Sequence, residues 1–197
     1  MHERITGLYD ENAAAWDRQR GRDLHESAWL ERFAALLTAG GSVLDLGCGM
    51  GEPIARWLIG RGFRVTGVDY SPSLIALCKE RFPKEAWHLA DMRELDLTQR
   101  FHGLIAWHSF FHLRPEDQRA MFARFAAHAE AAAGLMFTSG SEHGEKIGEW
   151  RGEPLYHASL DPAEYRRLLA RHGFAVVEQQ MSDPDCGHSN VWLARRT

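Results

Sequence analysis

The stretch 43-VLDLGCGMGEPIARWL-58 joins a short apolar segment to three glycines at alternate positions and then to a proline. An apolar run of this length that ends at glycine is typical of a strand buried on both faces of a parallel sheet. Ile54, Trp57 and Leu58 then recur at helical spacing, and Pro53 suits the first turn of a helix. The stretch therefore predicts a strand, a tight turn and a helix.

The same alternation continues along the chain. Helical patterns begin at Ser71 and at Pro115. Four further strand patterns occupy residues 64–70, 85–91, 104–110 and 133–139. Connections of helical length between apolar strands imply parallel pairing with helices on both faces of the sheet. The predicted fold class is α/β.

The two ends of the chain carry other patterns. Residues 8–37 have helical periodicity. Near the C-terminus, Asp161 is placed as a helix N-cap, and Glu164 is placed to reach back and complete a capping box. The strand patterns at 174–180 and 191–196 lie too close together for a helical crossover. We therefore expect the sheet to end in an antiparallel strand.

Glycines at 47, 49 and 51 let the backbone turn tightly and approach a ligand, because a β-carbon would fill that space. The dinucleotide-binding pattern G-x-G-x-x-G would place its third glycine at position 52, which is Glu52. Asp45 adds a second carboxylate beside the turn. Two nearby negative charges suit a cationic ligand group, an ammonium or a sulfonium, better than a diphosphate.

Acidic residues also end the next two predicted strands. Asp69 follows Gly49 by 20 residues, the spacing at which an acidic side chain accepts hydrogen bonds from ribose hydroxyls. Asp91 and Met92 end the third strand, where they could bind the amino group and cover the ring of an adenine. These positions together predict a nucleoside site.

The motifs 43-VLDLGCGMGEP-53, 67-GVDYS-71 and 89-LADM-92 resemble those of the class I S-adenosylmethionine-dependent methyltransferases. The resemblance implies a Rossmann-like three-layer sandwich with a mostly parallel seven-stranded sheet in the order 3-2-1-4-5-7-6 and an antiparallel last strand. It also implies that the glycine turn holds the methionine portion of S-adenosyl-L-methionine. The cofactor site expected from it comprises Asp45, Gly47, Cys48, Gly49, Asp69, Tyr70, Ser71, Asp91, Met92 and Trp107.

The same family binds its methyl acceptor after the fourth strand, where His108 and His112 lie. A histidine suits the base that a hydroxyl or ammonium acceptor requires, and both are our candidates for catalysis. Residues 140–160 form a predicted glycine-rich loop insert that carries His143 and His157 and could shape the substrate pocket. The residues predicted to contact substrate are Tyr9, Trp16, Phe111, His143, Trp150 and Tyr156.

Plainer interpretations stay open for several of these residues. The N-terminal helices, residues 1–40, could form a lid over the site, as in small-molecule members of the family, or only pack on the body. The insert could be a solvated loop. Cys48 is expected to contribute its backbone, and 183-DPDCGHS-189 lacks the paired spacing of a metal site, so we expect no metal. Oxygen, nitrogen, sulfur and carbon all remain open as the methylated atom.

Composition bounds the remaining possibilities. The 197 residues predict a single domain, and 23 Lys and Arg against 27 Asp and Glu disfavour a nucleic-acid partner. Three widely spaced cysteines, no secretory leader and no long apolar segment predict a cytoplasmic protein without a membrane partner. Three rival functions remain: a nicotinamide-dependent reductase, a nucleoside-binding module without catalysis, and a methyltransferase acting on nucleic acid. The last of these is also disfavoured because the chain has no Asn/Asp-Pro-Pro-aromatic tetrad after the fourth strand, where it reads 107-WHSF-110.

Overall fold

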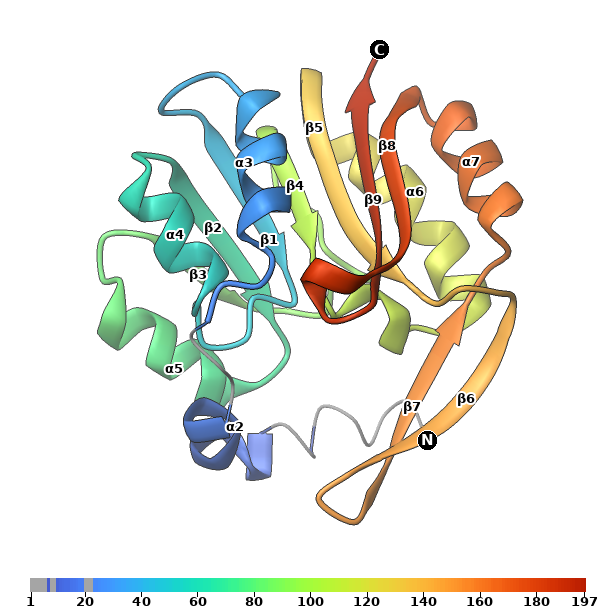
Figure 1. The fold of residues 1–197 in the computed structure, drawn as a ribbon. Coiled ribbons are helices and arrows are strands. Elements are labelled where there is room, and N and C mark those ends of the chain that lie inside the picture. The colour runs from blue at the N-terminus through green and yellow to red at the C-terminus, as the bar shows by residue number, and fades with distance from the viewer. Residues whose placement is uncertain (1–6, 8–9, 20–22) are drawn as a thin grey trace.

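The computed structural model of the chain describes residues 7, 10–19 and 23–197. Its helices are α2 (Ala13–Gln19), α3 (Ser27–Ala35), α4 (Ile54–Gly60), α5 (Pro72–Arg81), α6 (Pro115–His128) and α7 (Pro162–Arg171), with short 3-10 helices η1 (Phe110–His112) and η2 (Pro184–Cys186). Its strands are β1 (Ser42–Leu46), β2 (Arg64–Asp69), β3 (Ala86–Leu89), β4 (Phe101–Ala106), β5 (Ala129–Ser139), β6 (Gly144–Trp150), β7 (Glu153–Ser159), β8 (Phe174–Asp183) and β9 (Ser189–Arg196). Helices cover both faces of a central sheet (Figure 1).

The main sheet has seven strands in the order β3-β2-β1-β4-β5-β9-β8, and β6 and β7 form a separate hairpin. When the hairpin strands are left out of the count, this is the expected order 3-2-1-4-5-7-6. The strand β1 pairs in parallel with β2 and β4, whereas β9 is antiparallel to both β5 and β8. The predicted Rossmann-like fold with an antiparallel last strand is confirmed.

Successive side chains along a strand point to opposite faces of the sheet, and each face has its own hydrophobic core. Val43 packs in the core that α3, α4 and α5 cover, and its neighbour Leu44 packs in the core that α6 and α7 cover. Because both faces are covered, all five residues of β1 are buried. This burial is the reason that the strand reads as a continuous apolar run.

Local capping signals position the helices, with one correction. Ser71 caps α5 as predicted, and the side chain of Asp161 caps α7 by accepting a 2.7 Å hydrogen bond from the N–H of Ala163. The capping box predicted for Glu164 is wrong, because both of its carboxylate oxygens accept hydrogen bonds from the guanidinium of Arg119. A bidentate ion pair between arginine and a carboxylate is stronger than a hydrogen bond to one neutral N–H, so Glu164 pairs with Arg119 and not with the helix N-terminus.

Residues 140–160, predicted as a loop, form a β-hairpin instead. The strands β6 and β7 pair over their whole lengths, from Gly144–Ser159 to Trp150–Glu153. Arg151 and Gly152 between them have φ values of 57° and 79°, as the two central residues of a tight hairpin turn require. Most of β6 is exposed. The segment therefore lacks the apolar alternation by which a strand is recognised in sequence.

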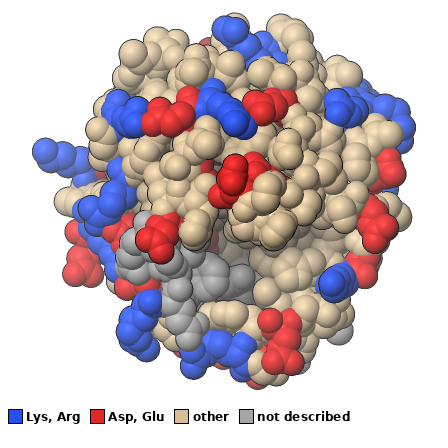
Figure 2. Space-filling model, viewed as in Figure 1, with Lys and Arg blue, Asp and Glu red and all other residues tan. Residues whose placement is uncertain are grey.

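The carboxyl ends of the parallel strands β1 to β4 lie at one edge of the sheet, and two accessory elements flank that edge. The helix α2 lies beside α5 on one side, and the β6–β7 hairpin extends from the other (Figure 1). The helical pattern predicted over residues 8–37 is divided, because α2 ends at Gln19 and α3 begins at Ser27. Seen from the same side, the space-filling view shows basic and acidic side chains scattered among uncharged ones, without one large patch of either sign on the described part of this face (Figure 2).

Candidate active site

The glycine turn after β1 closes against the segment that follows β4. Gly47 has a φ of 79°, and a β-carbon there would overlap the side chain of Ser109. The Ser109 hydroxyl donates a 2.5 Å hydrogen bond to the carbonyl of Leu46, which holds the two segments together. A β-carbon at Gly51, with a φ of 77°, would lie 2.9 Å from the ring of Phe82. The turn therefore requires glycine at these two positions.

Asp45 carries a buried carboxylate beside this turn. Its side chain belongs to β1 and is 3% exposed, and no described residue forms a hydrogen bond or ion pair with it. Burial, and then the negative charge of Asp69, raise its pKa to about 7. A cationic group bound beside Asp45 would offset both effects, because it favours the ionised carboxylate.

Asp69 at the end of β2 organises the turn. Its carboxylate accepts a 2.9 Å hydrogen bond from the N–H of Gly49 and a 3.0 Å bond from the N–H of Ser71. Burial raises the pKa of Asp69, although these backbone bonds oppose that change. The backbone of Tyr70 also contributes a hydrogen bond to this carboxylate. A carboxylate has about four acceptor sites, so at least one remains for a hydroxyl group of a ligand. The next side chain, Tyr70, is 53% exposed, which leaves its ring accessible at the edge of the site.

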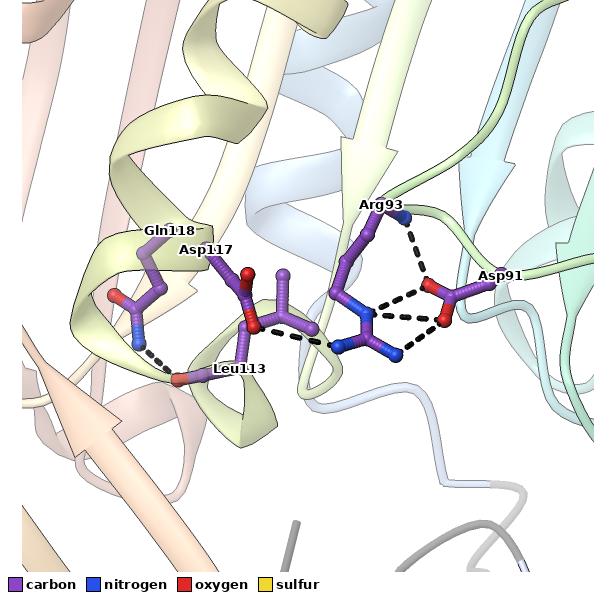
Figure 3. Close-up of polar contacts among 5 residues, drawn as sticks. All are labelled: Asp91, Arg93, Leu113, Asp117 and Gln118. Carbon is purple, nitrogen blue, oxygen red and sulfur yellow. Dashed lines mark hydrogen bonds and ion pairs between the residues drawn. The ribbon is translucent and has the colours of Figure 1, made fainter. Parts of the chain in front are cut away.

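Asp91 is engaged by an arginine that the sequence analysis did not consider. Figure 3 shows the guanidinium of Arg93 between Asp91 and Asp117, the latter in the first turn of α6. Nε of Arg93 lies 3.0 Å from each carboxylate oxygen of Asp91, and the backbone N–H of Arg93 donates a 2.8 Å bond to the same group. The Nη1–Oδ2 distance to Asp117 is 3.4 Å. Adenine recognition by Asp91 stays a prediction, and a ligand would share this carboxylate with Arg93.

Met92 lies nearer the glycine turn than its neighbour Asp91 does. A β-carbon on Gly47 would be 3.4 Å from the terminal methyl of Met92. The structure thus brings the expected methionine-binding and adenine-binding segments together.

Two cysteine thiols contact the backbone of the glycine turn. Sγ of Cys78 donates a 3.2 Å hydrogen bond to the carbonyl of Gly49, and Sγ of Cys48 lies 3.7 Å from the same oxygen. Burial raises the pKa of the Cys48 thiol well above its usual range. The protonated thiol is a poor nucleophile, which favours the expected structural role of Cys48.

The two candidate catalytic histidines are held differently. His112, in η1, has its Nδ1 atom 2.8 Å from the carbonyl oxygen of Tyr156 in β7. A carbonyl can only accept, so Nδ1 of His112 carries the proton, and in the neutral ring Nε2 is the basic nitrogen. His108 has a left-handed backbone with a φ of 49°, and its Nε2 atom lies 3.0 Å from the hydroxyl of Ser189.

The hairpin also brings His157 to this region, a residue that the sequence places in the insert without a specific role. The ring of His157 lies 4.9 Å from the ring of His112 and 5.2 Å from that of Phe111, measured between centroids. Burial is the main cause of the lowered pKa of His157, and the charge of Lys146 adds to it. His157 therefore joins the predicted substrate residue Phe111. Its position depends on the hairpin that the sequence did not reveal.

The other predicted substrate residues lie elsewhere. Tyr156 precedes His157 in β7, so its side chain points to the opposite face of the hairpin. There, burial and the carboxylate of Glu145 raise its pKa to about 12. Trp150 lies at the hairpin tip, and His143 is exposed before β6. Tyr9 lies outside the described residues, as does the side chain of Trp16.

Trp107, predicted to contact the cofactor, is 5% exposed. Its ring lies 5.3 Å from that of His108, at the carboxyl end of β4. This places Trp107 between the core and the histidine-bearing segment.

Polar contacts of Asp10, which precedes α2, and of Asp17 within α2 connect the N-terminal segment to α5. The Asp10 carboxylate accepts a 2.7 Å bond from the Ser71 hydroxyl and a 2.9 Å bond from the N–H of Ser73. Asp17 forms a 2.7 Å ion pair with Arg81, which also lies 3.5 Å from Glu52 in the glycine turn. The N-terminal segment is thereby connected to the turn through one arginine.

Neither a metal-ion cluster nor a membrane-spanning helix is found in the described parts of the chain. No three His, Cys, Asp or Glu side chains there are grouped as they would be around a metal ion. No helix in those parts combines the length and apolarity needed to cross a membrane.

Residues 43–131 match the family model described as a methyltransferase domain. Over 104 residues the chain is 36% identical to magnesium-protoporphyrin O-methyltransferase of Rhodobacter capsulatus, covering 50% of this chain and 45% of that protein. Over 115 residues it is 32% identical to a dTDP-3-amino-3,6-dideoxy-alpha-D-glucopyranose N,N-dimethyltransferase of Streptomyces fradiae, covering 55% and 44%. The chain thus spans less than half the length of these two relatives.

Solved structures resemble the chain over nearly its whole length. A 1,6-didemethyltoxoflavin-N1-methyltransferase of Burkholderia thailandensis, with bound 1,6-didemethyltoxoflavin and S-adenosylhomocysteine, has a TM-score of 0.76 at 22% identity, covering 98% of this chain and 87% of its own. The magnesium protoporphyrin IX methyltransferase of Synechocystis with bound S-adenosylhomocysteine also has a TM-score of 0.76, at 19% identity, covering 100% and 99%. At these identities the likeness establishes the fold.

Proposed function

We propose that the chain is a class I S-adenosylmethionine-dependent methyltransferase, as its methyltransferase-domain match over residues 43–131 supports, and that it transfers a methyl group from S-adenosyl-L-methionine to a small-molecule acceptor. One observation carries the proposal: the buried carboxylate of Asp45 has no partner among the described residues and lies beside the glycine turn. A β-carbon at Gly47 in that turn would overlap Ser109. A buried, unpaired carboxylate is costly unless a cationic ligand compensates it.

The residues at the strand ends fit this cofactor. The proposed contacts are Asp45 with the ammonium group, the glycine-turn backbone with the methionine portion, and the remaining acceptor capacity of Asp69 with the ribose. The exposed ring of Tyr70 supports a stacking role against adenine, which Asp91 and Met92 would also contact. Ser71, as the N-cap of α5, orients Asp69 through its N–H.

When bound, the cofactor supplies an electrophilic sulfonium methyl whose leaving thioether needs no protonation. The protein's own contribution is to align the acceptor and to take its proton. Alignment of the reacting atoms at about 3–3.5 Å can remove several kcal/mol of barrier. His112 is the stronger candidate for the base, because a carbonyl fixes its tautomer with Nε2 as the acceptor.

The accessory elements support a small acceptor bound at the carboxyl edge. The helix α2 is the proposed lid, and the β6–β7 hairpin is the proposed second wall (Figure 1). The three cysteines are free and buried, which suits the cytoplasmic location that we propose.

The reductase alternative is disfavoured by Glu52. This residue replaces the glycine that a dinucleotide would need, and its carboxylate pairs with Arg56 and Arg81 beside the turn. The alternative of a nucleoside-binding module predicts that the protein binds the cofactor but forms no S-adenosylhomocysteine with any acceptor, whereas an enzyme would form it.

Calorimetric titration tests the cofactor assignment. We expect S-adenosyl-L-methionine and S-adenosylhomocysteine to bind and NADH to give no saturable heat. Asp45→Asn and Asp69→Asn should each weaken binding at least about tenfold, a loss of about 1.4 kcal/mol. Asp96→Asn changes an exposed residue outside the site and is the matched control. Equal affinity in all four proteins, or binding of NADH alone, would refute the proposal.

A further inference from the structure

A cluster of aromatic rings lies at the carboxyl edge beside the expected cofactor site. The rings of Phe111, His112 and His157 all lie within 5.2 Å of one another between centroids, and His108 lies 5.7 Å from Phe111. Phe111, His112 and His157 are half-buried, so part of each ring is covered by the protein and part can meet a ligand. Two separate elements, η1 and β7, supply these three rings.

This ring cluster adjoins the glycine turn through a direct contact. Ser109 precedes η1, and its side chain both bonds the carbonyl of Leu46 and occupies the space that a β-carbon on Gly47 would need. Phe111 follows, by two residues, the serine that contacts the expected methionine-binding turn. This connection supports an acceptor site next to the cofactor site.

The hairpin fixes the orientation of His112 within the cluster. The outer edge of β7, which does not pair with β6, directs two carbonyls at the body of the protein. Tyr156 accepts from Nδ1 of His112 at 2.8 Å, and Ala158 accepts from Nε2 of Gln118 at 2.9 Å. Gln118 is fully buried and accepts a 2.6 Å bond from the hydroxyl of Tyr165. This buried hydrogen-bond network therefore holds β7 in place, and β7 in turn orients the imidazole ring of His112.

We propose that the methyl acceptor is a flat aromatic or heteroaromatic compound that packs against Phe111 and His157 and presents an O–H or N–H group to Nε2 at the edge of the His112 ring, which is inclined by 70° to that of Phe111. This inference rests on the proposed methyltransferase function and names its substrate class. Aromatic faces favour a planar partner, because offset stacking adds about 0.5–1.5 kcal/mol to the burial of apolar area. A saturated sugar would gain no such stacking from these rings.

The proton balance follows from the tautomer of His112. The acceptor's O–H or N–H proton passes to Nε2 as the oxygen or nitrogen forms its bond to the methyl carbon. The electron pair of the broken carbon–sulfur bond stays on sulfur, so the sulfonium becomes a neutral thioether. The imidazolium then returns the proton to water, with Nδ1–H still bonded to the carbonyl of Tyr156.

Binding of defined probes tests the inference without knowledge of the natural acceptor. The protein, saturated with S-adenosylhomocysteine, is titrated with 7-hydroxycoumarin and with lumazine, which are flat and carry an acidic O–H or N–H. Glucosamine, a saturated amino sugar, is the contrasting probe. The variants Phe111→Leu and His157→Leu remove one ring each, and His143→Leu removes an exposed histidine near the same hairpin as the control. Circular dichroism and the affinity for S-adenosylhomocysteine confirm that each variant is folded.

We expect at least one flat compound to bind, and its affinity to fall at least tenfold in Phe111→Leu and in His157→Leu but not in His143→Leu. Glucosamine should show no saturable binding over the same range. Binding of glucosamine alone, binding of none of the three, or equal affinity in all variants would overturn the inference. Failure of S-adenosylhomocysteine itself to bind would instead refute the proposed function, so the two failures are distinguishable.

Discussion

The backbone N–H of Gly49 donates a 2.9 Å hydrogen bond to the carboxylate of Asp69, 20 residues further along the chain. The side chain expected to hold the ribose is therefore also the one that fastens the glycine turn to the end of β2. The same carboxylate accepts from Ser71 at the start of α5. Cofactor contact and the local fold depend on one residue.

Asp69→Ala should consequently reduce stability as well as affinity. The substitution leaves the N–H groups of Gly49 and Ser71 without their acceptor, at about 1–3 kcal/mol for each group that water cannot reach. Relief of the buried charge offsets part of this loss. We expect a lower free energy of unfolding in urea together with weak cofactor binding. A variant as stable as the parent protein would contradict the dual role.

Gly47→Ala should damage the turn, because the new β-carbon would overlap Ser109 and the φ of 79° is unfavourable for alanine. We expect a loss of about 1–3 kcal/mol in unfolding free energy and at least tenfold weaker cofactor binding. Gly60→Ala is the matched control, because Gly60 ends α4 and a β-carbon there meets nothing within 4 Å. That variant should be unchanged or stabilised by about 0.5–1 kcal/mol. Equal behaviour of the two variants would be inconsistent with this packing.

The stability of the free protein should fall as the pH rises through the range in which Asp45 titrates. The pKa of Asp45 is raised from 3.8 to about 7 in the folded chain, so the folded state holds this proton more tightly than the unfolded state. The contribution is fully present below pH 4 and is lost as the pH approaches about 7, by up to roughly 4 kcal/mol.

Asp45→Asn should flatten this pH dependence and raise the unfolding free energy at pH 8, while it weakens cofactor binding. Urea unfolding at a series of pH values measures the first effect. Because the cofactor's cationic groups favour the ionised carboxylate, binding to the parent protein should release protons near pH 6.5. Calorimetry in two buffers of different ionisation enthalpy detects that release, and a parent protein with no proton release would contradict the role of Asp45.

Asp17→Asn should loosen α2 with little effect on global stability. The Asp17–Arg81 pair is about one-fifth exposed on each side, and pairs of this kind contribute less than about 1 kcal/mol. We expect faster hydrogen exchange in α2 and faster cofactor release. Glu178→Gln, which breaks the exposed pair with Arg32 on α3, is the control and should alter neither rate. Unchanged exchange in α2 would argue against the docking role of Asp17.

Gln118→Leu should detach the hairpin from the body. The change removes the donor to the carbonyls of Leu113 and Ala158 and the acceptor of the Tyr165 hydroxyl, at about 1–3 kcal/mol for each group left unsatisfied. In the parent protein, nitrogen-15 spectra should show His112 protonated at Nδ1. We expect that preference to weaken in the variant, because β7 no longer holds the carbonyl of Tyr156 in place. An unaltered His112 spectrum would show that the hairpin does not depend on Gln118.

Much of the fold could be predicted from local sequence because the responsible interactions are local. The buried run of β1, the glycines that tolerate positive φ, and the caps Ser71 and Asp161 act within a few residues of themselves. The same holds for Asp69, whose distance from Gly49 follows from one strand–helix–strand unit. These features determined the sheet, its helical cover and the expected cofactor edge.

Tertiary structure alone decided which side chains meet across elements. Arg93 reaches Asp117 in α6, Arg119 pairs with Glu164 in place of the predicted capping box, and His157 reaches His112 only because residues 140–160 pair as a hairpin. A sequence pattern reports which face of an element is buried, whereas these contacts depend on where separate elements are packed. Because most of β6 is exposed, its pattern carried no such signal. The contacts of the hairpin with Phe111 and His112, which the sequence already placed near the acceptor, were therefore decided only by the tertiary structure.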